Sequence, residues 1–376
     1  MFTKKKKLFI VTDQVFDKRQ SERYQLKALN KKFDLKIVVF KNNFLKIKNC
    51  KFYFINNLIS FFKFFNNKKK IIYIEILSNN LANLLIKLIF FIKRAKKILI
   101  VMGHYPTFKK NENIIISFFK KIFIYRKDSL FAILKHRIFM IVDKIYKPSL
   151  IISGGEEAKK IYTNRTKKHF NFTSHDFYLF DKNNKNNKNN NKKNKYILFL
   201  DSGLLGNSDF TLFSVNLPFD KKEYVQKLKN FFSILEKKYN LKTIISPHPK
   251  TNLRELKKNF KKFKVIPGQT EKLIANSQFV VMHKSTAVSY VVLNQKPLIL
   301  ITFDKIKDIW YGKDITNLKK LLGVKELNLD RFKEEKNICF TFNKIKYKNY
   351  IHNFIKSENV LYEKYANGIC KAISNL

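Results

Sequence analysis

Short apolar runs alternate with longer amphipathic segments along this chain, and this alternation limits its fold more than any other feature. In the first half, strand-like runs occupy residues 7–13, 35–40, 71–77, 97–103 and 149–155, and helix-like segments occupy residues 21–31 and 83–96. Strands that alternate with helices form βαβ units and a parallel sheet. The run IIYIEIL is apolar almost throughout, which is typical of a strand buried on both faces.

The same alternation starts again at residue 196 with YILFLDSGLLG. Further strand-like runs lie at residues 241–250, 263–269, 278–286 and 296–302, with helix-like segments at 221–239, 253–263, 271–276 and 287–294. Between the halves, the tract DKNNKNNKNNNKKNK has no apolar residue and indicates a solvated linker at residues 181–195. We therefore expect an α/β protein with two Rossmann-like, doubly wound domains that face a central cleft.

The chain is strongly basic, with 77 Lys and Arg against 28 Asp and Glu and a net charge of +49. Such a charge suggests an anionic partner. A chain crowded with Lys, Asn, Ile and Phe, with only 9 Gly and 7 Pro, is also what strong AT bias in a genome produces. The basic residues are spread along the chain without a nucleic-acid-binding signature, so no specific nucleic acid is expected as partner.

The cysteines and the apolar stretches bear on the compartment. Cys50, Cys339 and Cys370 are scattered without a CxxC pair, which predicts an intracellular, reduced protein. No secretory signal is expected at the start of the chain. The most apolar stretch, residues 81–92, is broken by Lys87 and is too short to span a bilayer. The basic, aromatic region at 114–146 could lie on an anionic membrane surface or form ordinary domain helices.

Two polar segments follow strands at the start of the second half. Asp201, Ser202 and Gly203 end the first strand, where a glycine lets the backbone approach a ligand and a carboxylate can accept from hydroxyls. An Asp at this place can also be a plain turn residue. The prolines on both sides of His248 restrict its backbone, which favours an imidazole aimed at a phosphate or a leaving oxygen.

Other polar residues complete the candidate site. Pro247, Pro249 and Lys250 surround His248, and Lys250 adds positive charge. The segment His283, Lys284, Ser285 and Thr286 links a strand to a helix, an arrangement in which hydroxyls cap the helix and its free N–H groups bind an anion. Plain capping by Ser285 is the alternative, and the two roles are compatible.

The order D-S-G, H-P-K, G-Q-T-E and H-K-S-T-A followed by K-P-L-I-L resembles the bacterial GT-B glycosyltransferases of surface carbohydrate biosynthesis, which build capsule and lipopolysaccharide. Within them it is most similar to the sialyltransferase and polysialyltransferase group. The resemblance implies that His248 contacts the donor phosphate and the leaving group. It implies that Ser285 and Thr286 bind the same phosphate, and that Gly268 and Glu271 lie at the nucleotide-binding edge. Glu271 could equally be a first-turn helix carboxylate.

The resemblance implies a metal-independent glycosyltransferase that moves a sugar from a nucleotide donor to a glycan or lipid-linked glycan acceptor, with a CMP-activated, sialic-acid-like sugar as the best guess for the donor. No cofactor is expected, because the nucleotide sugar is a co-substrate. No metal is expected either, since the sequence has no paired His spacing and no Asp-x-Asp. Such an enzyme would be cytoplasmic, with attachment to the inner face of the inner membrane as an option.

Domain roles follow from the same resemblance. Residues 1–180 would be the acceptor domain and residues 196–345 the nucleotide-sugar domain, while residues 346–376 would form helices that pack back on the first domain. Enzymes of this family use an acidic residue in a D/E-D/E-G setting as general base, and the first half has no such tripeptide. The base is therefore sought among Asp13, Glu75 and His104, with His175 and Asp176 as further candidates.

Two other functions remain open on the sequence alone. A polyol-phosphate transferase of the kind that uses CDP-glycerol shares the GT-B fold and basic surfaces, but would need more His and Arg around the acceptor phosphate. A noncatalytic, basic polyanion-binding protein is the other, and the presence of His248 and Ser285 argues mildly against it.

Overall fold

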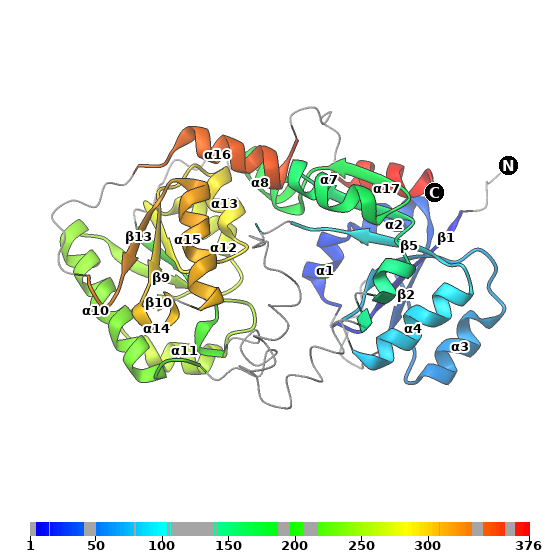
Figure 1. Ribbon diagram of the computed structural model, residues 1–376, viewed down its shortest axis with the longest axis horizontal. Coiled ribbons are helices and arrows are strands. Elements are labelled where there is room, and N and C mark those ends of the chain that lie inside the picture. Colours follow the sequence, from blue (N-terminus) through cyan, green and yellow to red (C-terminus); the bar gives the residue numbers. More distant parts are fainter. Residues whose placement is uncertain are drawn as a thin grey trace. The chain divides into compact units, whose positions relative to one another are not determined.

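The structure is a computed structural model of the 376-residue chain. It describes residues 5–14, 16–40, 50–78, 80–103, 106, 138, 139, 141–186, 196–206, 217–307, 309–332, 341–357 and 365–376. Contacts divide the described chain into two compact units (Figure 1). The first unit takes the described residues up to 103, those at 138–175 and those from 356 onward, and the second takes residue 106 and those at 176–355.

The first unit is built on a seven-stranded, wholly parallel sheet in the order β3-β2-β1-β4-β5-β6-β7. Its strands are β1 (Lys7–Thr12), β2 (Asp34–Val39), β3 (Lys51–Phe54), β4 (Ile72–Ile76), β5 (Lys96–Ile100), β6 (Leu150–Gly154) and β7 (His169–Phe172). Its helices are α1 (Lys18–Arg23), α2 (Leu26–Lys32), α3 (Leu58–Asn66), α4 (Leu81–Ile92), α7 (Glu156–Tyr162) and α17 (Tyr365–Ser374). The order of strands reverses between β1 and β4, which pair directly.

Aromatic side chains fill much of the core between this sheet and α3 and α4. Tyr73 of β4 stacks on Phe90 of α4 at a centroid distance of 4.1 Å. Phe61 and Phe65 of α3 each contact the ring of Phe90, and Phe65 also contacts Phe9 of β1. Burial of such large apolar surfaces is the main stabilising contribution to folding.

The second unit has a six-stranded parallel sheet in the order β10-β9-β8-β11-β12-β13. Its strands are β8 (Tyr196–Leu200), β9 (Lys242–Ser246), β10 (Lys264–Val265), β11 (Phe279–Met282), β12 (Leu298–Thr302) and β13 (Lys325–Asn328). Its helices are α8 (His175–Asn186), α10 (Lys221–Tyr239), α11 (Leu253–Asn259), α12 (Thr270–Asn276), α13 (Val288–Leu293), α14 (Asp304–Lys307), α15 (Trp310–Leu322) and α16 (Lys344–Tyr350). The predicted fold class, with two Rossmann-like α/β sheets, is confirmed.

Helix α10 illustrates how the sequence directs these elements. The Asp220 side chain accepts a hydrogen bond from the Glu223 N–H at 2.8 Å and so caps the first turn. Asn240 ends the helix in the left-handed conformation, with φ of 50°. Between them, apolar residues three or four positions apart, such as Leu228 and Phe232, are buried against the sheet.

The chain between the two units begins differently from the expected linker. Helix α8 continues to Asn186, well into the Asn/Lys tract. Phe177 and Phe180 of this helix pack against the core of the second unit, and this anchor accounts for the helix at the start of a tract that itself has nothing to bury. Residues 187–195 lie outside the described part of the chain.

The C-terminal region divides between the units at Lys356 rather than at residue 346. Tyr347 and Tyr350 of α16 are buried in the second core, and the Tyr347 hydroxyl donates to the Lys296 carbonyl at 2.9 Å. Helix α17 belongs to the first unit, where a Cβ on Gly368 would lie only 2.6 Å from the Phe172 ring. Close packing at this glycine holds α17 against the end of β7.

Candidate functional site

The strand order of the second unit brings the predicted motifs to one edge of its sheet. Strand β8 lies between β9 and β11, and the order reverses there, so β8 and β11 flank a topological switch point. Ligands bind outside the carboxyl ends of strands at such points. The loops after β8, β9, β10 and β11 carry Asp201, His248, Gly268 and Ser285, which places all four motifs at this edge.

Asp201 joins two of these loops. The residue is 8% exposed, and its carboxylate accepts from the Gly203 N–H at 2.8 Å, the Thr251 hydroxyl at 2.8 Å and the His248 N–H at 3.3 Å. Its own N–H donates to the Ser246 carbonyl at 2.9 Å. With three donors on its two oxygens, the carboxylate acts as the anchor of the His248 loop.

Gly203 is required for two reasons. Its φ of 69° lies in the left-handed region, which side chains rarely adopt. A Cβ here would also lie 3.3 Å from Cβ, Cγ and Nδ1 of His248. The backbone of the β8 loop therefore lies close to the His248 side chain and limits where the ring can lie.

The His248 ring is also held from its own loop. Pro247 is buried, His248 is half-buried, and Pro249 and Lys250 are exposed. The Lys250 N–H donates to Nδ1 of His248 at 3.2 Å. Because Nδ1 accepts this bond, the neutral ring carries its proton on Nε2 and has an N–H donor there.

Ser202 leads to a residue that sequence reasoning missed. Its Oγ accepts from the hydroxyl of Tyr311 at 2.8 Å, and Tyr311 on α15 is buried. Nζ of Lys284 lies 4.5 Å from the centre of the Tyr311 ring and 2.7 Å from a carboxylate oxygen of Asp314. Tyr311 thus links the loops after β8 and β11, and no local motif around it in the sequence indicates this role.

His283 belongs to the core. It is fully buried, its Nδ1–H donates to the Ile301 carbonyl at 2.7 Å, and its Nε2 accepts from the Tyr224 hydroxyl at 2.9 Å. Burial lowers the pKa of His283 to about 4. Both ring nitrogens are used inside the unit, so the expectation that His283 binds substrate is corrected: its imidazole positions the loop after β11.

Ser285 forms a turn instead of a helix cap. Helix α13 begins after Ala287, which makes no side-chain cap, and the Ala287 N–H donates to Oγ of Ser285 at 3.2 Å. The Ser285 carbonyl accepts from the Val288 N–H at 3.1 Å. Its oxygen accepts in the turn, so its O–H can still donate to a ligand. Thr286 beside it is exposed.

Gly268 and Glu271 flank the start of α12. Gly268 has φ of 74°, is exposed, and has open space where a Cβ would lie. Glu271 is in the first turn of α12, where a carboxylate stabilises the helix. Oγ1 of Thr270 lies 2.9 Å from Oγ of Ser246, and this contact ties the start of α12 to the residue just before the His248 loop.

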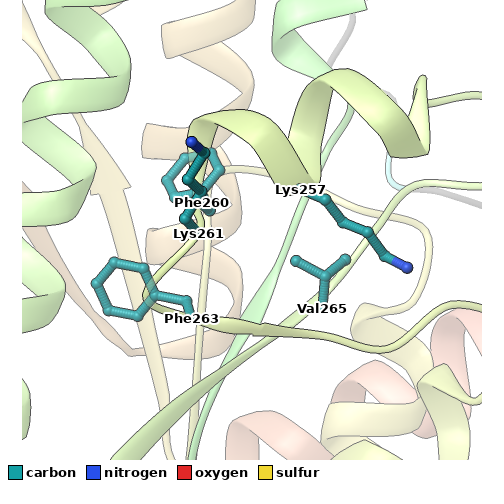
Figure 2. Close-up of a pocket in the computed structure, with 5 residues that line it drawn as sticks. All are labelled: Lys257, Phe260, Lys261, Phe263 and Val265. Carbon is teal, nitrogen blue, oxygen red and sulfur yellow. The ribbon is translucent and has the colours of Figure 1, made fainter.

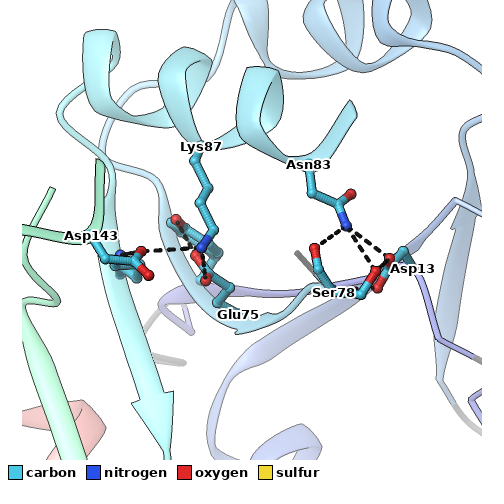
Figure 3. A network of polar contacts seen from close by, with 8 residues as sticks. Asp13, Glu75, Ser78, Asn83, Lys87 and Asp143 are labelled. Atoms are coloured by element: carbon cyan, nitrogen blue, oxygen red, sulfur yellow. Dashed lines mark hydrogen bonds and ion pairs between the residues drawn. The ribbon is translucent and has the colours of Figure 1, made fainter. Parts of the chain in front are cut away.

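Asp13 in the first unit occupies the matching switch point, between β1 and β4. Figure 3 shows its carboxylate facing Ser78 and Asn83. It accepts from the Ser78 N–H at 2.9 Å, the Ser78 hydroxyl, Nδ2 of Asn83 at 2.8 Å and Nδ2 of Asn80 at 3.2 Å. The Asp13 side chain therefore ties the loop after β1 to the start of α4.

Glu75 lies inside β4 rather than at its end, and its side chain is buried. It pairs with Nζ of Lys87 at 3.1 Å, and Lys87 pairs with Asp143 at 3.1 Å (Figure 3). Burial opposes the charge of Lys87, but Glu75 and Asp143 outweigh it and raise the pKa of this lysine. The expectation of Glu75 as general base is corrected, because its carboxylate is engaged in this internal network.

The remaining candidates are distributed as follows. His104 lies outside the described residues. His175 is buried, with its ring 5.9 Å from that of Tyr365, and burial together with Arg23 lowers the pKa of His175 to about 4. Asp176 follows it in the first turn of α8. Within the described part of the chain, no three His, Cys, Asp or Glu side chains gather so that they could hold a metal ion.

A hollow of about 330 Å³ lies away from this edge. Figure 2 shows its lining, Lys257 and Lys261 with Phe260, Phe263 and Val265, between the end of α11 and β10. Most of these residues precede β10, so they lie toward the amino ends of the parallel strands. The hollow is separate from the loops that carry His248 and Ser285.

Comparison with known proteins gives the fold. No known protein family and no curated protein matches the sequence. The UDP-GlcNAc 2-epimerase of Methanocaldococcus jannaschii, in complex with UDP-GlcNAc and UDP, matches with a TM-score of 0.50 at 16% identity, over 92% of this chain and 98% of that chain. A second structure of that enzyme matches with a TM-score of 0.50 at 15% identity, over 98% and 100%.

WaaG, a glycosyltransferase involved in lipopolysaccharide biosynthesis, matches with a TM-score of 0.44 at 6% identity, over 97% of this chain and 98% of that chain. The two epimerase structures match nearly the whole chain. At 15–16% identity, this similarity is evidence for the fold only. It supports the GT-B type of fold with two Rossmann-like domains. In the described residues, none of the helices is long and apolar enough to span a membrane.

Proposed function

We propose that the second unit binds a nucleotide sugar at the carboxyl edge of β8, β9 and β11, and that the protein is a glycosyltransferase of bacterial surface-glycan biosynthesis. The observation that carries the proposal is the immobilised ring of His248. Asp201 holds its backbone, Gly203 lies against its side chain, and the Lys250 N–H fixes its tautomer. Two constraints on a half-buried imidazole and one on its backbone are typical of a group that must meet a ligand in one orientation.

The chemistry of this edge suits a departing nucleotide. When a sugar leaves its donor, negative charge develops on the phosphate oxygen. The Nε2–H of His248 would donate to that oxygen, the ammonium group of Lys250 would lower the energy of the charge, and the Ser285 hydroxyl would donate to the same phosphate. None of these steps requires a bound metal ion.

For the acceptor side of the reaction we propose a class of acceptor and no general base. Neither Asp13 nor Glu75 is proposed as the general base, because their carboxylates are engaged within the first unit. The acceptor is proposed to be a glycan or lipid-linked glycan, on the resemblance of the second half to enzymes of capsule and lipopolysaccharide synthesis.

Two kinds of nucleotide sugar are candidate donors. The order of the HP and Ser/Thr motifs resembles the sialyltransferase group and favours a CMP-activated sugar. The epimerase that shares the fold is described with UDP-GlcNAc and UDP, which favours a UDP sugar. Isothermal calorimetry with CMP, UDP, CDP and GDP separates these donors, since one nucleotide should bind at least about tenfold more tightly than the others.

The same titration with variants tests the site. His248→Ala should abolish the binding, and His248→Gln, which keeps an N–H donor, should restore part of it. Lys250→Ala should weaken binding, whereas Lys242→Ala should not, because Lys242 is also exposed but starts β9 at the opposite edge of the sheet. Absence of nucleotide binding, or equal effects of the two lysine variants, would contradict the proposal.

A second candidate, epimerisation of a UDP-sugar, is favoured by the likeness to UDP-GlcNAc 2-epimerase over nearly the whole length of both chains. Incubation with UDP-GlcNAc in the absence of any acceptor, followed by proton NMR, distinguishes the two activities. Conversion at C2 would establish the epimerase. Transfer only when a glycan acceptor is added would establish the glycosyltransferase.

A further inference from the structure

Helix α4 exposes an apolar stripe, while its inner face buries two polar side chains beside Ile86 and Phe90. Leu81, Leu85, Leu88 and Ile92 form one stripe along the helix and are 53%, 46%, 39% and 78% exposed. The opposite face buries Asn83 and Lys87, each 2% exposed. A surface helix of a globular protein normally turns its apolar stripe to the core and its polar residues to water.

Internal contacts hold the helix in this orientation. Nδ2 of Asn83 donates to Asp13 at 2.8 Å, and Nζ of Lys87 lies 3.1 Å from both Glu75 and Asp143 (Figure 3). A rotation that buried the outer leucines would remove Asn83 and Lys87 from these partners, at a high cost in free energy. The apolar stripe is therefore a stable feature of the surface.

Neighbouring helices extend this surface. Helix α3, which lies beside α4 on the same side of the sheet in Figure 1, exposes Ile59 (68%) and Phe62 (48%). The helical residues 141–145 adjoin α4 through the Lys87–Asp143 ion pair and expose Ile141 and Ile145, at 56% and 62%. We call the outer sides of α3, α4 and residues 141–145 the apolar face.

The apolar side chains are concentrated in this unit. Of thirteen large apolar side chains that are exposed among the described residues, eleven lie in the first unit and only Leu253 and Ile345 in the second. Single exposed apolar residues need no explanation, but a contiguous apolar patch marks a surface that meets a partner or a membrane.

The charge of this region indicates the kind of partner. Residues 50–103 contain ten Lys and Arg and one acid, Glu75, which is buried against Lys87. Lys63 is exposed on α3, Arg94 is exposed beyond α4, and Nζ of Lys93 lies 5.7 Å from the Phe62 ring. Apolar side chains rimmed by cations suit an anionic lipid surface. A second copy of this chain would bring the same positive charge and be repelled.

We propose that the apolar face docks the first unit on an anionic lipid bilayer. Leu85, Leu88 and Ile92 would enter the boundary between headgroups and acyl chains, and Lys63, Lys93 and Arg94 would meet lipid phosphates. Helix α4 has 12 residues and is about 18 Å long, so it lies in the plane of the interface and does not cross the membrane. This inference does not rest on the proposed transferase activity.

The test is sedimentation of the full chain with vesicles of phosphatidylcholine and with vesicles that also contain phosphatidylglycerol. The double variant Leu88→Gln/Ile92→Gln should lower the partition coefficient on anionic vesicles by at least about tenfold. The control Leu253→Gln/Ile345→Gln should leave it unchanged. The pairs match in residue type and exposure, 39% and 78% against 37% and 73%.

Separate measurements test the contribution of charge to vesicle binding and the folding of each variant. Lys63→Glu should weaken binding to anionic vesicles, and added salt should weaken it further. Thermal unfolding of each variant shows that its fold is kept. The proposal is overturned if the chain does not bind anionic vesicles, if both double variants bind equally, or if Leu88→Gln/Ile92→Gln instead dissociates an oligomer in analytical ultracentrifugation.

Discussion

Asp201 and His248 are joined through the backbone: Oδ2 of Asp201 accepts from the His248 N–H at 3.3 Å and from the Thr251 hydroxyl at 2.8 Å. The carboxylate after β8 thereby fixes the loop after β9. In the first unit Asp13, which also follows the first strand of its sheet, fixes the start of α4 through Ser78 and Asn83. Both sheets use the first acidic residue beyond their first strand to order loops at the carboxyl edge of the sheet.

Asp201→Asn tests the first of these anchors. An amide has one oxygen, so its NH₂ group would face either the Gly203 N–H or the Thr251 hydroxyl and the His248 N–H. We expect urea denaturation to show a loss of about 1–3 kcal/mol in the free energy of unfolding, and calorimetry to show weaker nucleotide binding.

Asp220→Asn is the matched control, because Asp220 caps α10 and Asn caps a helix equally well. It should leave both quantities close to wild type. Nucleotide binding by Asp201→Asn at wild-type affinity would show that this carboxylate does not hold the binding loop.

Gly203→Ala and Gly268→Ala separate backbone strain from contact with His248. Both glycines have positive φ, 69° and 74°, so each variant should lose about 1–2 kcal/mol of stability. Only at Gly203 would the new methyl group lie 3.3 Å from the imidazole. NMR spectra of the histidine side chains should therefore show displaced His248 ring signals in Gly203→Ala and unchanged ones in Gly268→Ala. Equal effects of the two variants on the ring would contradict this contact.

The central strands of both sheets could be predicted from the sequence, because strands buried on two faces read as continuous apolar runs. The edge strands β3 and β7 could not. Each has only four residues, Lys51–Phe54 and His169–Phe172, of which only Phe172 is buried, so neither resembles the longer buried run of a central strand. The expected helix at residues 21–31 is divided in two, because Gln25 adopts a left-handed conformation with φ of 53°.

The meeting of the candidate motifs at one edge was predictable for a similar reason: in a parallel sheet, all carboxyl ends lie at one edge. The roles of individual side chains were not. Whether Asp201 or His283 faces a ligand depends on Thr251 and Tyr224, which reach them from other elements. The burial of Lys87 on α4 depends in the same way on Glu75 and Asp143, since the sequence alone predicts that a lysine in an apolar helix faces solvent.

Because the ion pair between Glu75 and Lys87 is buried, removing one partner should destabilise the protein more than removing both. Lys87→Met should cost about 3–5 kcal/mol, because it leaves Glu75 charged and buried without its partner. The double variant Lys87→Met/Glu75→Leu should recover much of that loss. Urea denaturation of the four proteins in this cycle measures the coupling.

Lys160→Met is the control for that cycle, because Lys160 forms an exposed ion pair with Glu157 on α7. It should have no measurable effect on stability. If the double variant is as unstable as Lys87→Met alone, the loss of stability does not come from leaving the Glu75 carboxylate without its ion-pair partner.

The two buried histidines predict how stability depends on pH. Burial lowers the pKa of His283 and of His175 to about 4, against an ordinary value of 6.5, so each is neutral in the folded state while the unfolded chain binds a proton. The unfolded state therefore binds more protons between pH 6.5 and 4, and stability falls as the pH is lowered through this range. Each histidine should account for about 3 kcal/mol of that loss. Urea denaturation at several pH values should show a shallower dependence for His283→Gln than for the wild-type protein, and an unchanged slope would mean that His283 is not the buried neutral group that the contacts of its two ring nitrogens imply.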